Sequence, residues 1–253
     1  MFSVSSLALA SLMAIRVCAD PNNLPFSNSS QQGFENRIAA LVARDLHRPL
    51  QYFWLPQRRG FVRNSLKAGR CDLVIGTPVS SGRLQPTRAY YRSSYAFVSR
   101  RDRHLRIASF DDARLKTLTI GIQLTGDDYN NPPAAYALAS RRIIDNVRGF
   151  PVYGDYSRPD PLRGIVDAVA GGKVDVAVVW GPVAGYFGQR EPVAMDVVAV
   201  HGAGDGPALP LEFDIAMGVR PGDDALRAAV DRIIERRRAE IRQILTAYGV
   251  PLR

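Results

Sequence analysis

Polar and aromatic side chains directly follow four apolar runs of this 253-residue chain, and their types suit ligand binding. These segments are Asp20 to Phe26, Gly76-Thr77-Pro78, Gln123 to Asp127 and Trp180-Gly181-Pro182. They offer amides, glycines, a hydroxyl and aromatic rings, which hold a small molecule by hydrogen bonds and stacking. Each segment alone is also typical of a turn. Four of them at matching positions favour a binding protein over a catalyst.

Catalytic and cofactor motifs are missing from the sequence. It has no G-x-S-x-G, no G-x-x-x-x-G-K, no C-x-x-C and no H-E-x-x-H. His47, His104 and His201 stand beside polar or turn residues, as surface histidines do, and Glu191 and Glu212 have no identifiable acid–base partner. Two cysteines and three histidines disfavour a Cys/His metal site. We expect no catalytic residue, no metal and no cofactor.

Composition indicates an ordinary globular chain with a surplus of positive charge. Hydrophobic residues make up 46% and charged residues 23%, and the net charge is +9. This charge favours anionic ligands or acidic partner proteins. Gln57, Arg58 and Arg59 lie between a predicted strand and a short helix, and we predict that they form an exposed, partner-facing surface. No nucleic-acid-binding motif surrounds the arginine clusters, so nucleic acid is not an expected partner.

Elements that would position these residues alternate between strand and helix. The first half predicts strands over 15–19, 51–55 and 71–76, with helices over 34–46 and 60–68 between them. The second half predicts strands over 94–98, 118–122, 174–179 and 213–219, a helix from Asp160-Pro161 and a closing helix from about Asp223 to Gly249. The order is typical of two α/β lobes with a cleft between them.

Residues 1–14 are predicted to be a truncated export signal. Leu7 to Leu12 is small and apolar, and Ala8-Leu9-Ala10 fits a signal-cleavage pattern, although no basic residue precedes the run. The alternative is a frayed N-terminus or a wrongly assigned start codon. The run is too short to span a bilayer.

Cys18 and Cys71 are predicted to remain unpaired thiols, although an even cysteine count in an exported protein argues for pairing. The expected strand ends place Cys18 beside Val74 or Ile75. Cys71 would then lie about 10 Å farther along the strand, beyond the roughly 7 Å that a disulfide allows between Cα atoms.

Longer sequence segments resemble a known family. They are RVCADPNNLPFSN (16–28), PQRRGFVRN (56–64), CDLVIG (71–76), YYRSSYAFV (90–98), NVRGFPVYGDY (146–156) and DVAVVWGPVAGYF (175–187). The chain resembles the type II periplasmic solute-binding proteins over nearly its whole length. More narrowly, it is similar to their quinoprotein dehydrogenase-associated branch, the MoxJ/XoxJ type.

This resemblance implies an α/β, two-lobed periplasmic binding protein type II fold, in which each lobe is a mixed sheet flanked by helices and two hinge strands join the lobes. Lobe 1 would comprise residues 15–98, with 215–253 as a hinge strand and C-terminal helix that complete it, and lobe 2 would comprise 99–214. The cleft would be lined by residues at strand ends: Asn23, Phe26, Trp54, Thr77, Tyr95, Gln123, Thr125, Gly126 and Trp180.

Two departures from amino-acid-binding relatives bear on the ligand. Those relatives hold the ligand ammonium with an Asp at the end of a D-x-x-x-x-D pattern, whereas here Asp175 opens the pattern and Trp180 ends it. An indole cannot neutralise a buried cation by ion pairing. Arg83 lies near the position of the family's carboxylate-binding Arg, but its spacing is shifted. Amino-acid binding is therefore disfavoured.

The resemblance implies a periplasmic accessory factor for a PQQ-dependent methanol or alcohol dehydrogenase, with the dehydrogenase or its cytochrome as partner. The alternative is an ABC-importer receptor for a small anionic or aromatic solute. An enzyme is the third reading, because a few proteins of this fold have become dehydratases. The sequence does not separate the first two functions, since both use the same cleft.

Overall fold

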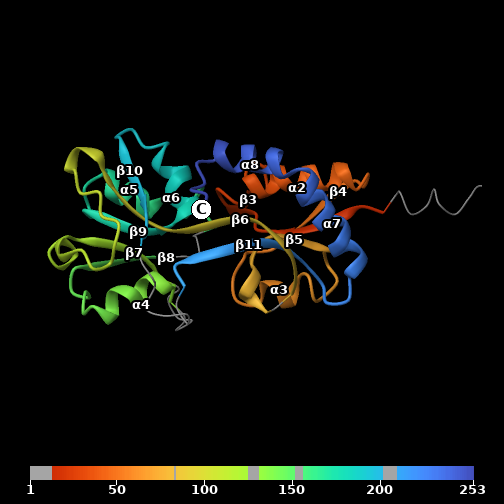
Figure 1. The fold of residues 1–253 in the computed structure, drawn as a ribbon, viewed down its shortest axis with the longest axis horizontal. Coiled ribbons are helices and arrows are strands. Elements are labelled where there is room, and N and C mark those ends of the chain that lie inside the picture. The colour runs from red at the N-terminus through yellow and green to blue at the C-terminus, as the bar shows by residue number, and fades with distance from the viewer. Residues whose placement is uncertain (1–12, 83, 125–130, 152–155, 202–209) are drawn as a thin grey trace, which may run out of the picture. The chain divides into compact units, whose positions relative to one another are not determined.

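The computed structural model describes residues 13–82, 84–124, 131–151, 156–201 and 210–253 (Figure 1). The chain divides into two compact units. Unit 1 comprises Met1–Tyr91 and Asp214–Ile244, and unit 2 comprises Arg92–Phe213 and Leu245–Arg253. The predicted α/β class is confirmed in both units. Residues 245–253 belong to unit 2, whereas the sequence analysis assigned all of 215–253 to lobe 1.

Unit 1 is built on a mixed sheet. Its strands are β1 (Ile15–Ala19), β4 (Leu50–Trp54), β5 (Leu73–Pro78), β11 (Glu212–Val219) and the first part of β6 (Gln85–Arg100), in the order β4-β1-β5-β11-β6. Strands β4, β1 and β5 run parallel, and β11 is antiparallel to β5. The hairpin of β2 (Asn22–Asn23) and β3 (Ser27–Asn28) follows β1.

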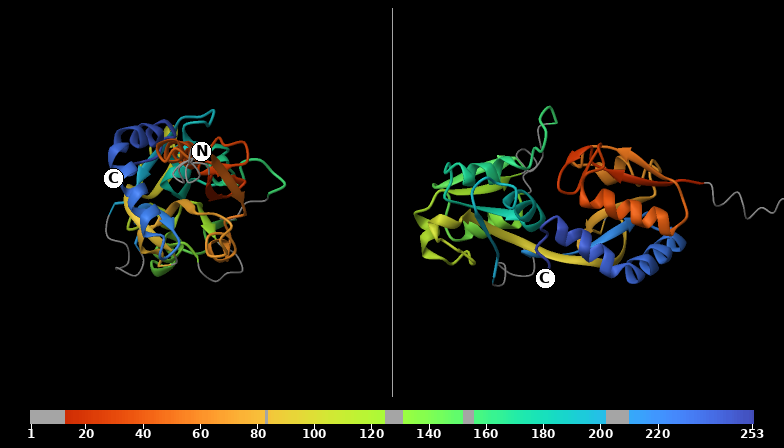
Figure 2. Two further views of the ribbon diagram at one scale, coloured as in Figure 1. Left: turned by 90° about the vertical axis from the view of Figure 1, so that its right-hand side faces the viewer. Right: turned by 90° about the horizontal axis from the view of Figure 1, so that it is seen from above.

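Helices cover the sheet of unit 1 because their apolar faces need burial. Helix α2 (Phe34–Asp45) buries Phe34, Ile38 and Leu41 at helical spacing. Helices α7 (Asp224–Arg236) and α8 (Arg238–Ala247) replace the single closing helix predicted from the sequence. Figure 2 shows α7 beside α2, where Arg237 of the break between α7 and α8 forms an ion pair of 2.9 Å with Asp45. Helix α3 is short (Phe61–Asn64), and turns follow it.

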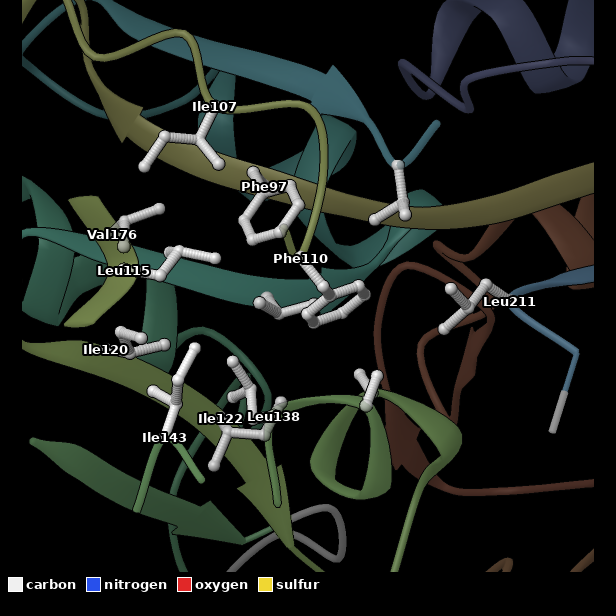
Figure 3. Packing of buried hydrophobic residues seen from close by; sticks show 14 residues of the cluster. Phe97, Ile107, Phe110, Leu115, Ile120, Ile122, Leu138, Ile143, Val176 and Leu211 are labelled. Atoms are coloured by element: carbon white, nitrogen blue, oxygen red, sulfur yellow. The ribbon is translucent and has the colours of Figure 1, made fainter. Parts of the chain in front are cut away.

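Unit 2 repeats the α/β arrangement. Its strands are the end of β6, β7 (Ile120–Leu124), β8 (Val147–Pro151), β9 (Val176–Trp180) and β10 (Met195–Ala199), and its helices are α4 (Pro133–Ser140), α5 (Gly164–Ala170) and α6 (Gly181–Gly188). Strands β9, β7 and β8 are parallel, and β6 is antiparallel to β9 and β10. Side chains that include Phe97, Phe110 and Ile122 form its buried core (Figure 3).

Cys18 and Cys71 form a disulfide with a Cα–Cα distance of 5.4 Å, so the prediction of free thiols is wrong. The expected register was correct, because Cys18 lies opposite Val74. The prediction fails because Cys71 does not lie on β5, although the sequence predicts a strand over 71–76. Strand β5 begins only at Leu73, and the chain before it bends toward Cys18 instead of extending away along β1.

The C-terminal segment packs on α6 within unit 2. Gly181 and Gly185 present their bare faces to Pro251 and Gly249, and a Cβ on Gly185 would overlap the carbonyl oxygen of Gly249. The Tyr248 ring stacks on Tyr186 at 5.6 Å. Glycine is therefore required in this helix, because any side chain would push the segment away.

Gly185→Ala is expected to lower the free energy of unfolding of unit 2 by about 1–3 kcal/mol, because the new methyl group forces the C-terminal segment off α6. Urea unfolding measures this change, and carboxypeptidase digestion should become faster as the segment detaches. The control is Gly164→Ala at the start of α5, where a Cβ meets nothing within 4 Å. Equal stability of the two variants would contradict the close packing.

Candidate functional site

The carboxyl ends of the parallel strands in unit 1 meet at one edge of its sheet. Ala19 lies opposite Trp54 and Cys18 lies opposite Val74, so Trp54, Asp20 and Gly76 come to the same edge. Loops that follow such strand ends present side chains and backbone N–H groups together. This edge therefore carries the unit 1 residues predicted from the sequence.

Three of the four predicted residues of unit 1 keep polar or aromatic surface partly accessible. Asn23 and Phe26, in and after β2, are half-buried, as is Trp54, whose ring stacks on Tyr52 at 4.5 Å. Phe26 meets Phe34 edge-on at 5.4 Å. Thr77 is more enclosed, with its hydroxyl 3.3 Å from Ser81 Oγ. Aromatic rings with one open face can stack on a flat ligand.

Asp20 fixes the loops around these residues. Its buried carboxylate accepts hydrogen bonds from the backbone N–H groups of Asn22 (2.8 Å) and Gln57 (2.6 Å). Asn23 Nδ2 in turn donates to Gln57 Oε1 at 3.2 Å. The structure therefore joins Asn23 of the predicted cleft set to Gln57 of the predicted partner surface, two residues that the sequence does not connect.

Glu35, in the first turn of α2, is a group at this edge that the sequence analysis missed. Its Oε1 lies directly against Gly76, where a Cβ would overlap it. Burial, and secondarily the charge of Asp20, raise the pKa of Glu35 to about 8. The position therefore holds a carboxylic acid that is largely protonated at neutral pH.

Tyrosines surround Glu35. Burial is the main cause that raises the pKa values of Tyr52, Tyr90 and Tyr91, and the charge of Glu35 adds to it in each case. The buried hydroxyl of Tyr90 has no hydrogen-bond partner within the described residues. The signals for this cluster in the sequence were the acid at the start of α2 and the glycine that ends an apolar strand, but neither reveals the contact between them.

Unit 2 brings Tyr95 and Trp180 together. They lie opposite each other on β6 and β9, with ring centroids 5.4 Å apart, and Phe213 meets Trp180 at 5.7 Å. Trp180 is partly exposed, and Gln123, near the end of β7, is buried. Burial raises the pKa of Tyr95 far above its usual range. Phe213 also belongs to this aromatic group. The sequence did not indicate its role, because Phe213 lies in a predicted strand and does not follow the end of one.

Three candidate ligand-binding residues lie outside the described residues. They are Thr125 and Gly126 of the predicted cleft set and Arg83 of the shifted carboxylate-binding pattern. The segment 1–14, predicted as an export signal, is described only from Met13 onward.

A hollow of about 440 Å³ lies on unit 2 between α6, β10 and the C-terminal segment. Its walls include Gln189, Met195 and Pro251, together with Glu191, whose nearly buried carboxylate forms an ion pair of 3.1 Å with Arg163. Burial, and secondarily the neighbouring Asp167, raise the pKa of Glu191 against the opposing effect of Arg163, which Asp167 also pairs with.

Gln57, Arg58 and Arg59 are exposed in the loop between β4 and α3. In the described ranges, no group of three or more His, Cys, Asp or Glu side chains is arranged to hold a metal ion. Nor does any helix among the described residues combine the length and apolar character needed to cross a bilayer.

A family model decides the class of the protein. Residues 15–250 match the bacterial extracellular solute-binding proteins, family 3. The chain belongs to this family. This family 3 solute-binding protein has two α/β units, in agreement with the fold class that the resemblance implied.

Individual relatives narrow the likeness to the MoxJ/XoxJ type, which is confirmed. The chain is 34% identical to Protein MoxJ of Methylorubrum extorquens over 94% of its own length and 81% of the relative. It is 29% identical to Protein MoxJ of Paracoccus denitrificans over 99% and 93%. The crystal structure of the periplasmic binding protein XoxJ from Methylobacterium extorquens AM1 is 35% identical, with a TM-score of 0.77 over 95% of this chain and 99% of that one.

Proposed function

We propose that this family 3 solute-binding protein is a periplasmic accessory factor for a PQQ-dependent methanol or alcohol dehydrogenase, which it matures, activates or binds. The observation that supports the proposal best is the likeness to MoxJ and XoxJ over nearly the whole chain. The resemblance of the sequence to the quinoprotein dehydrogenase-associated branch implies the same role. Trp180 ends β9 at the position where amino-acid-binding relatives place a carboxylate. This difference supports a function other than amino-acid transport.

The second candidate is a receptor that delivers a small anionic or aromatic solute to an ABC importer. The family itself favours it, because its members are described as extracellular solute-binding proteins. The solute would contact Asn23, Phe26, Trp54 and Thr77 of unit 1. On unit 2 it would contact Tyr95, Gln123, Thr125, Gly126 and Trp180.

A pull-down with the purified dehydrogenase, run beside a thermal-shift screen of solutes and PQQ, tests the two functions. A complex with no solute effect supports the accessory factor. A solute that raises the melting temperature supports the receptor, because a ligand of the native state stabilises it by mass action. Neither complex nor shift would contradict both.

The tryptophans give a direct readout, because the chain has only Trp54 and Trp180, one in each proposed set. A receptor is expected to show a change in the emission of both on solute binding, since an aromatic or charged ligand alters the surroundings of each indole. Trp54→Phe and Trp180→Phe separate the two signals. A solute that shifts the melting temperature but leaves both emissions unchanged would place binding elsewhere.

A further inference from the structure

One stretch of the sequence of unit 1 is rich in basic residues and contains no acidic residue. Between Asp45 and Asp72 the sequence contains no Asp or Glu. Five basic side chains fall within this interval and are exposed; together they form the cationic face, Arg58, Arg59, Arg63, Lys67 and Arg70. Such a concentration of one sign of charge raises the local potential and attracts anionic partners.

Several arginines elsewhere in unit 1 are paired with carboxylates. The pairs include Arg16–Asp72, Arg44–Glu240, Arg88–Glu235 and Arg237–Asp45. Arg63, Lys67 and Arg70 differ, because none of them has a carboxylate partner among the described residues. Arg63 reaches only Asn64 Oδ1 at 3.4 Å, and the Arg70 guanidinium lies 6.0 Å from the ring centroid of Phe53.

The backbone that carries these side chains is well fixed. Its N–H groups at Asn64, Lys67 and Arg70 donate to carbonyl oxygens of the same segment at 2.9–3.0 Å. On its inner side, Phe61 and Leu66 pack with the Cys18–Cys71 disulfide in a buried cluster. A fixed backbone removes the backbone part of the ordering cost on binding.

We propose that the cationic face binds an acidic surface of a partner protein, and, resting on the proposed function, that this partner is the PQQ-dependent dehydrogenase. Four of the five residues are arginines, whose planar guanidinium pairs with carboxylates through two parallel hydrogen bonds. The large hydrophobic side chains exposed among the described residues (Met13, Val79, Tyr136 and Ile144) all lie outside the segment, which gives a membrane nothing apolar to take up.

Charge reversal tests the face by association kinetics with the purified dehydrogenase. Arg63→Glu/Lys67→Glu/Arg70→Glu is expected to slow association about tenfold at low ionic strength and to flatten its salt dependence. The matched control, Lys116→Glu/Arg142→Glu/Lys173→Glu, reverses three exposed basic residues of unit 2 and changes the net charge equally. Its rate should stay within about twofold of wild type. Should the reversal variant fail to fold, the corresponding Gln variant is expected to show the same trend at smaller amplitude.

The outcomes separate this proposal from the proposed function. A wild-type protein that does not bind the dehydrogenase overturns both. If wild type binds the dehydrogenase and the charge-reversal and control variants associate with it at equal rates, the proposal for the cationic face alone is wrong. Binding to vesicles of phosphatidylglycerol is the third measurement. If the vesicles retain wild type but not the charge-reversal variant, and both proteins bind the dehydrogenase equally, the cationic face is a membrane site and the proposal is wrong.

Discussion

Reduction of the Cys18–Cys71 disulfide is expected to lower the free energy of unfolding of unit 1 by about 4 kcal/mol. The bond spans 53 residues, and closing a loop of this length removes that much chain entropy from the unfolded state. Urea unfolding with and without a reductant measures the difference.

Cys18→Ala/Cys71→Ala is the control for the reductant, because its stability should not respond to it. The variant also reports the loss of two buried sulfur atoms, since Cys18 and Cys71 are 3% and 0% exposed. Thiol titration of denatured, unreduced wild-type protein should find no free thiol. Two free thiols would show that the bond does not form.

Replacement of Glu35 by Gln is expected to stabilise unit 1 at alkaline pH. The pKa of Glu35 is raised by burial from 4.5 to about 8, so the folded state holds a proton that the unfolded state releases between these values. The stability that the protonated acid contributes is therefore complete below about pH 4.5 and is lost as the pH rises to about 8. A shift of this size corresponds to at most about 5 kcal/mol.

Free energies of unfolding at about pH 5 and pH 9 measure this effect. Glu35→Gln, which carries no titrating proton, should lose less stability than wild type between the two values. Glu235→Gln is the control, because Glu235 is an exposed partner of Arg88 and its change should be the same at both pH values. A parallel pH dependence of Glu35→Gln and wild type would mean that Glu35 is solvated and ionised normally.

Local apolar patterns were sufficient to predict the main sheet elements. Strand β9 is a continuous apolar run and β1 and β5 are largely apolar and buried, which is typical of parallel strands buried on both faces. Trp54 and Trp180 are the last residues of β4 and β9, within one residue of the predicted strand ends. Strands β8 and β10 and helices α4 and α6 were not predicted. Strand β8 contains a glycine and a proline, and α6 contains three glycines and a proline, which do not favour a strand or a helix by themselves.

The disulfide and the environment of Glu35 depend on long-range packing, so they could not be predicted from the sequence. Strand β5 begins two residues later than predicted, and this difference brings the Cα atoms of Cys18 and Cys71 within the range of a disulfide. No local sequence pattern fixes a strand boundary that closely. Glu35 has the sequence position of an ordinary solvated acid in the first helical turn. Its environment is changed by groups distant in the sequence, namely Gly76, 41 positions along the chain, and Asp20 and the tyrosines described above.

The discontinuity of unit 1 has a consequence for the order in which the protein is made. A chain that leaves the ribosome or the export channel N-terminus first presents β1, β4 and β5 long before β11, which follows all of residues 92–211. Until β11 arrives, the edge of β5 that it will cover is open to pairing with other chains. The Cys18–Cys71 bond needs only the first 71 residues, so it can hold β1 and β5 in register while this edge waits for its last strand.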